Sequence, residues 1–306
     1  MSERKKLDAI LLGIVGAFFF AFTFILNRSM SLGGGYWMYS AILRYVFTLP
    51  ILSAALIKGK KYAPVLTDIK KQPMRWLVWS TVGFGLFYLP LTAASLYAES
   101  WFICAMWQVT IVCGVLLTPL FGKRLPVRNL SCSCLILVGI ALMQVQHFRD
   151  GGSVGLVTAF LLILVAAFSY PLGNRKTMSF CEQSLSTVQR VFGMTLCSMP
   201  FWLFCAVIAA LNAGAPEWQQ CVQALGVAVF SGVLATLLFF KATDMVRTDA
   251  KLLAAVEATQ CGEVVFTLLL GIVILHDDAP SLTGWIGIAV IVLGMLLTSL
   301  VKDEKE

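Results

Sequence analysis

Ten long apolar runs divide this chain, and its basic residues gather in alternate connections between them. If every run crosses a membrane, 18 of the 23 Lys and Arg residues fall on one side, and only Arg28 and Arg149 fall on the other. Short cytoplasmic loops of membrane proteins carry the excess of basic residues. The pattern therefore predicts an all-α integral membrane protein with ten transmembrane helices and both termini in the cytoplasm. The predicted spans are 8–27, 36–57, 76–98, 101–121, 129–147, 154–173, 186–211, 221–243, 250–275 and 282–301.

Composition excludes an ordinary soluble domain, since 59% of the residues are hydrophobic and only 13% are charged. Ten spans of about 20 residues each use most of a chain of 306 residues, which leaves little room for a soluble catalytic domain. The net charge of +7 lies mainly in the predicted cytoplasmic loops, where it faces membrane lipids rather than nucleic acid. We expect a multi-pass protein of the bacterial inner (plasma) membrane, either monomeric or homodimeric.

Motifs for metal or nucleotide chemistry do not emerge from the sequence. The nine cysteines lie mostly in apolar runs, and Cys132 and Cys134 form a lone C-x-C without a second pair. His147 and His276 do not have the spacing of metal ligands. A phosphate-binding G-x-x-x-x-G-K-[ST] loop is not present. We therefore expect no metal, no cofactor and no enzymatic activity.

Weak internal similarity suggests two halves, residues 1–150 and 151–306. Asn27-Arg28 corresponds to Asn174-Arg175 at an offset of 147 residues, and Arg44 corresponds to Arg190 at an offset of 146. Five spans is an odd number, so the second half would enter the membrane from the opposite face. Such inverted repeats are typical of alternating-access transporters, whose substrate site lies near the membrane midplane.

The arginine in the second span of each half and the short connections at 97–100 and 246–249 resemble the drug/metabolite transporter superfamily, in its ten-helix EamA-like branch. The segment 255–263 is similar to the sub-branch described as "putative multidrug resistance efflux transporter". Lys123-Arg124 depart from the family pattern, which has a glutamate there. The resemblance covers essentially the whole chain and implies a central cavity lined by spans 1, 3 and 4 and by spans 6, 8 and 9, with the last helix of each half at the periphery.

Two carboxylates inside the ninth span are the strongest site candidates. An intramembrane carboxylate costs about 2.5–3.5 kcal/mol to insert, so it must face a cavity or a partner. Glu257, Gln260 and Glu263 would form one polar arc about 120° wide on a regular helix. Burial favours the protonated form of such a carboxyl group, so a proton and a substrate could compete for it. The alternative is a structural ion pair with Arg44, Arg190 or Lys241.

The remaining candidates each carry a structural alternative. Arg44 and Arg190 are structural anchors or charge partners, and Lys241 is either a cavity cation or a side chain that reaches the cytoplasm. Trp107 and Gln108 could stack on and orient an aromatic or cationic ligand. Other polar groups that could line the cavity or satisfy each other in the core are Asn27, Tyr88, Tyr170 and Asn174.

The hypothesis that follows is a secondary transporter for a small organic solute, with protons as a possible coupling ion. Proton-coupled export of a drug-like or aromatic, cationic metabolite is favoured. Facilitative or exchange transport of amino acids or other anionic or zwitterionic metabolites is the alternative.

Overall fold

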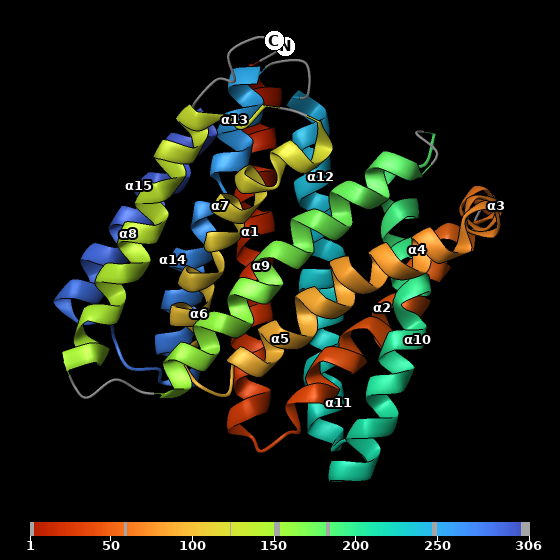
Figure 1. The fold of residues 1–306 in the computed structure, drawn as a ribbon, viewed down its shortest axis with the longest axis horizontal. Helices are drawn as coiled ribbons and strands as arrows, with labels where there is room; N and C mark the ends of the chain where they lie inside the picture. The colour runs from red at the N-terminus through yellow and green to blue at the C-terminus, as the bar shows by residue number, and fades with distance from the viewer. Residues whose placement is uncertain are drawn as a thin grey trace.

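All regular elements are helical in the computed structural model, which describes residues 3–57, 60–122, 124–149, 154–181, 184–246 and 250–300 (Figure 1). The longest helices are α1 (Glu3–Leu32), α2 (Trp37–Ile57), α8 (Val127–Arg149), α9 (Val154–Phe180), α10 (Thr187–Ala213) and α15 (Leu282–Leu300). Five basic residues of the charge pattern lie outside the described residues: Lys58, Lys123, Arg247, Lys302 and Lys305.

Consecutive shorter helices build the other spans. The third predicted span consists of α4 (Pro73–Ser80), the π-helical segment η2 (Thr81–Gly85) and α5 (Leu86–Ala94). The fourth consists of α6 (Ser100–Trp107), α7 (Val109–Leu116) and the 3₁₀ turn η3 (Thr118–Phe121). The eighth consists of α11 (Trp218–Val227), η4 (Ala228–Ala235, π-helical) and α12 (Thr236–Val246). The ninth consists of α13 (Ala250–Ala258), α14 (Cys261–Leu270) and η5 (Gly271–Leu275, π-helical).

Eight helical stretches of the described residues are long and apolar enough to cross a membrane. Two shorter apolar helices, Ser100–Leu116 and Val127–Met143, occupy the fourth and fifth predicted spans. The prediction of an all-helical, membrane-type chain is confirmed for these residues.

Several predicted boundaries are wrong. The predicted spans 8–27 and 154–173 end before their helices do, because α1 continues to Leu32 and α9 continues to Phe180. The charged residues Arg28 and Arg175 do not mark helix ends, because a helix can continue beyond the hydrocarbon core into the interfacial region. The basic connection after α2 also contains an unpredicted helix, α3 (Ala63–Lys71), whose Asp68 accepts a hydrogen bond from the indole of Trp76 at 3.1 Å.

Helices of the two halves pack in reciprocal pairs. The helix α1 packs against η4 and α12, whereas α9 packs against the corresponding η2 and α5. In the same way α1 packs against α14 and α9 against α7, while α2 pairs with α10 and α8 with α15. The pair α8–α15 lies at one edge of the bundle (left in Figure 1).

Glycines permit the closest of these contacts. A Cβ atom on Gly173 of α9 would lie 2.3 Å from Cα of Gly83 in η2. In the α8–α15 pair, a Cβ atom on Gly139 would lie 2.6 Å from the carbonyl oxygen of Gly287. Small residues at helix interfaces in membranes let backbones approach and gain van der Waals contact. These positions therefore fix the distance between the halves, and with it the space between them.

Candidate functional site

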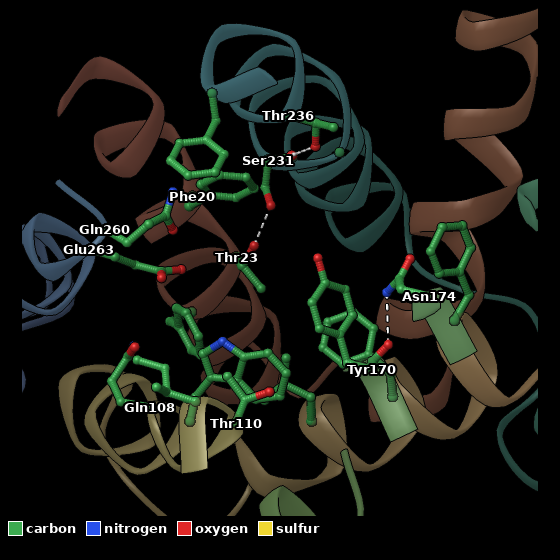
Figure 2. Close-up of a pocket in the computed structure, with 18 of the residues that line it drawn as sticks. Phe20, Thr23, Gln108, Thr110, Tyr170, Asn174, Ser231, Thr236, Gln260 and Glu263 are labelled. Atoms are coloured by element: carbon green, nitrogen blue, oxygen red, sulfur yellow. Dashed lines mark hydrogen bonds between the residues drawn. The ribbon is translucent and has the colours of Figure 1, made fainter. Parts of the chain in front are cut away.

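A cavity of about 520 Å³ lies between the two halves, and residues from α1, α2, α9, α10, α15 and the segmented spans line it. This volume is in the range of pockets that hold small organic molecules. Figure 2 shows Gln260, Glu263 and Gln108 on one side of the cavity and Tyr170 and Asn174 on the other. Thr23 and Ser231, whose hydroxyl groups form a hydrogen bond, lie between them.

Glu257, Gln260 and Glu263 all line this cavity. The Glu263 side chain is only 8% exposed, and Gln108, whose amide nitrogen donates to the carbonyl oxygen of Cys104 at 3.1 Å, lines the cavity with it. Glu257 is more accessible. The amide nitrogen of Gln260 is buried without a hydrogen-bond partner. Within the described residues neither carboxylate forms an ion pair with Arg44, Arg190 or Lys241, so the charges of this wall face the cavity.

The helix that carries these groups is interrupted, which the assumption of a regular helix did not predict. Thr259 and Gln260 separate α13 from α14, and the backbone N–H groups of both residues bond to carbonyls three residues back. Gln108 interrupts the fourth span between α6 and α7 with the same three-residue pattern. The two interruptions belong to packed neighbours, since α6 contacts α14. Broken helices expose backbone polar groups where they can serve a buried site.

Arg44 lines the cavity as well. Its guanidinium carbon lies 4.0 Å from the ring centre of Tyr88 and 5.8 Å from that of Tyr45. Its Nη2 donates a long hydrogen bond of 3.4 Å to Ser231 Oγ, and its Nη1 is buried without a partner. A desolvated cation–π contact stabilises by about 2 kcal/mol. This gain does not exceed the free-energy cost of placing the Arg44 charge inside a membrane.

Three aromatic side chains that contact one another form part of the cavity wall. Phe87 lies 5.1 Å from Trp107 and 4.8 Å from Tyr170, measured between ring centres. Trp107 is only 9% exposed and is mostly packed, whereas Tyr170 is 40% exposed. Asn174 bonds back to the carbonyl oxygen of Tyr170 at 2.8 Å and lines the cavity with it. This wall offers flat apolar surface to a ligand.

Four candidates from the sequence do not line the cavity. Asn27 and Tyr88 are buried and hydrogen-bond each other at 3.0–3.1 Å, which corresponds to their structural alternative. Lys241 is exposed. Arg190 donates to Thr187 Oγ1 at 3.3 Å near the start of α10.

Sequence reasoning missed the hydroxyl-bearing lining of the cavity. A hydroxyl group is a weak signal, because within an apolar helix it can bond to a backbone carbonyl of the preceding turn, as Thr195 does. Only the spatial gathering of these side chains from different spans identifies them. The hydroxyl-bearing lining residues are Thr23, Thr48, Thr110, Thr195, Ser231, Thr236, Thr298 and Ser299.

Hydrogen bonds between loops and helix ends close one end of the bundle. Asp277 accepts bonds from the backbone N–H of Ser100 at 3.0 Å and from its hydroxyl at 2.5 Å. The indole of Trp101 donates to the carbonyl of Asp278 at 3.0 Å, and Arg28 donates to the carbonyl of Ser95 at 3.0 Å. The cavity instead reaches Thr298 and Ser299 in α15, toward the end where the basic connections predict the cytoplasm.

A bundle of apolar helices long enough to cross a membrane, with charged groups facing a cavity inside it, defines a multi-pass membrane protein with an internal cavity. The chain belongs to the family described as "putative multidrug resistance efflux transporter", whose sequence model matches residues 7–304. The resemblance predicted from the segment 255–263 is thereby confirmed.

Two uncharacterized bacterial proteins are similar to this chain over most of its length. An uncharacterized protein of Bacillus subtilis (strain 168), YjlA, is 44% identical over 98% of this chain and 97% of its own length. An uncharacterized 42.1 kDa protein of Shouchella clausii is 43% identical over 86% of this chain and 72% of its own length. A solved crystal structure covers 94% of this chain and 95% of its own at a TM-score of 0.63. At 17% identity, that likeness supports the fold alone.

Proposed function

We propose that this protein is a secondary transporter that exports a small aromatic or cationic organic solute across the bacterial inner membrane in exchange for protons. The observation that carries the proposal is the pair of carboxylates, Glu257 and Glu263, in one cavity without a described basic partner. A carboxyl group that is neutral when protonated and anionic when a cation binds couples the two ligands by competition. The family match supports transport rather than catalysis.

Alternating access would follow from ten crossings arranged as two inverted repeats, residues 1–150 and 151–306, with both termini in the cytoplasm. The reciprocal packing of the halves supports this arrangement. So do the π-helical segments η2 and η4, which interrupt corresponding spans at an offset of 147 residues from Thr81 to Ala228. Inverted-repeat transporters place their substrate between the repeats, which is where the cavity lies.

The proposal is tested in proteoliposomes with an acidic lumen, a clamped membrane voltage and two radiolabelled probes, tetraphenylphosphonium and tryptophan. The wild type is expected to accumulate at least one probe when the gradient is imposed. Replacement of both carboxylates (Glu257→Gln with Glu263→Gln) removes the titratable groups and should reduce gradient-driven uptake by about 100-fold or more. Glu217→Gln, an exposed carboxylate outside the cavity, is the matched control. Unchanged gradient-driven uptake in the double variant, or no uptake by the wild type, contradicts the proposal.

A further inference from the structure

We propose that Arg44 binds a carboxylate of the transported compound, so that the substrate is an aromatic molecule with a carboxylate and an amine rather than a simple organic cation. The inference rests on the transport function proposed above and specifies its substrate class. It concerns a residue that the sequence analysis interprets as a structural anchor or charge partner.

Arg44 is a cation inside the bundle whose charge is not balanced by a described carboxylate. Its polar contact is a single long bond to Ser231, and Nη1 has no acceptor at all. A guanidinium group offers donors in a planar fork that matches a carboxylate. A structural anchor is expected to make a short bond to a protein acceptor, as Arg175 of α9 does with the carbonyl oxygen of Gly114 at 2.6 Å.

The opposite charge lies elsewhere in the same cavity. Glu263 and Glu257 line it, while Arg44 is held against Tyr88 and Tyr45. Tyr170 lines the same cavity, on the side opposite Glu263 (Figure 2). The cavity thus presents a cation, aromatic side chains and carboxylates to one ligand. A molecule with a carboxylate, an aromatic body and an amine complements all three.

The space available fits a compound of this size. A cavity of 520 Å³ holds an indole ring with a short charged side chain, and its aromatic wall of Trp107, Phe87 and Tyr170 gives the ring a surface to stack on. A monovalent cation alone would leave Arg44 unpaired and add a like charge to the cavity. Arg44 therefore acts as a specificity-determining residue that selects for a carboxylate.

The test is isothermal titration calorimetry of the purified protein at pH 7 with three probes that share an indole ring. Tryptophan carries both charges, tryptamine only the amine and indole-3-propionate only the carboxylate. The wild type is expected to bind tryptophan about tenfold or more tightly than tryptamine. In Arg44→Gln, tryptophan affinity should fall by about tenfold or more while tryptamine affinity stays within about threefold. Arg190→Gln, the corresponding arginine outside the cavity, should bind all three probes as the wild type does.

Arg44→Lys keeps the charge but not the planar fork, so it tests the same claim if the glutamine variant does not fold. It should lower the preference for tryptophan over tryptamine without changing the unfolding temperature by more than a few degrees. The inference is overturned if the wild type does not bind tryptophan, if it binds tryptamine equally well, or if both Arg44 variants keep the wild-type preference. Because binding is measured without a proton gradient, these outcomes are separate from a failure of proton coupling, which only the flux assay detects.

Discussion

A carboxyl group inside a membrane protein avoids an exposed charge in one of two ways, by pairing with a cation or by holding a proton. Glu263 has the Gln108 amide beside it, and within the described residues it does not have a basic partner. An amide can donate to a carboxylate and accept from a protonated carboxyl group, so it serves both forms. This neutral partner suits a group that must change its protonation state during a transport cycle.

The buried side chains of Asn27 and Tyr88 contribute to stability rather than to the site, because they satisfy each other's hydrogen-bonding groups. Tyr88→Phe leaves the Asn27 amide buried without its partner, which should destabilise the fold by about 1–3 kcal/mol. The ring that faces Arg44 is retained, so the cation–π contact survives. Thermal unfolding in detergent measures the effect, with the 42% exposed Tyr97→Phe as control. Equal unfolding temperatures for the two variants would show that the pair does not stabilise the core.

Charged groups of the site could be recognised from the sequence, because an ionisable residue in an apolar run is rare and must face a cavity or a partner. Glu257, Glu263 and Arg44 are of this kind, and all three line the cavity. Lys241 carries the same signal but is exposed, in the middle of α12. Whether a charged residue of this kind lines the cavity depends on its depth in the membrane. For Lys241 that depth depends on how far α12 continues past the apolar core.

At the scale of single elements, the interrupted helices determine which polar groups line the cavity. A pattern of apolar residues predicts that a span is helical, but it does not distinguish an α-helix from an α-helix with a π-helical or three-residue turn. The breaks at Gln108 and Gln260 arise where polar side chains face the cavity rather than another helix. They result from tertiary packing, which is why local sequence did not predict them.

The contact between α9 and η2 gives a prediction for an element. In Gly173→Ala the added Cβ would lie 2.3 Å from Gly83 Cα, and the nearest atoms are backbone atoms that cannot move alone. Overpacking of this kind should destabilise the protein by about 1–3 kcal/mol or more and shift the helices that bound the cavity. Thermal unfolding and monodispersity in detergent report it. Gly114→Ala is the control, because its Cβ would meet only ordinary contacts at 3.5 Å or beyond. Wild-type behaviour of Gly173→Ala would mean that α9 is not held this closely.

At the scale of the whole molecule, the two ends of the bundle differ. The end with Ser100 and Asp277 is closed by polar contacts, whereas the cavity extends toward the end where α12, α13 and α15 meet the basic connections. The all-helical, membrane-type character of the chain could be read from the sequence. The difference between the two ends could not, because it depends on contacts such as that of Ser100 with Asp277, which are far apart in the sequence.

Asp277 provides the corresponding prediction. Asp277→Asn replaces charge-assisted bonds to Ser100 with weaker ones, at a cost of about 1.5–3 kcal/mol to the closed end. Since 1.4 kcal/mol is a factor of ten in population, the state open at this end should become substantially populated. Distances between spin labels at the exposed positions Tyr97 and Trp218 would report the opening. Asp278→Asn is the control, because that side chain is exposed and only its carbonyl oxygen is bonded. Identical distance distributions would exclude a latch at Asp277.

Proton coupling through the cavity carboxylates is the central claim, and a comparison of two fluxes in the same proteoliposomes tests it most directly. Gradient-driven accumulation needs a proton to move, whereas exchange of labelled for unlabelled probe without a gradient needs only binding and the conformational change. The double variant Glu257→Gln with Glu263→Gln should lose gradient-driven accumulation more completely than exchange, because the glutamine carbonyls can still accept a hydrogen bond from an amine but cannot carry a proton. Accumulation that persists at the wild-type level would contradict the account.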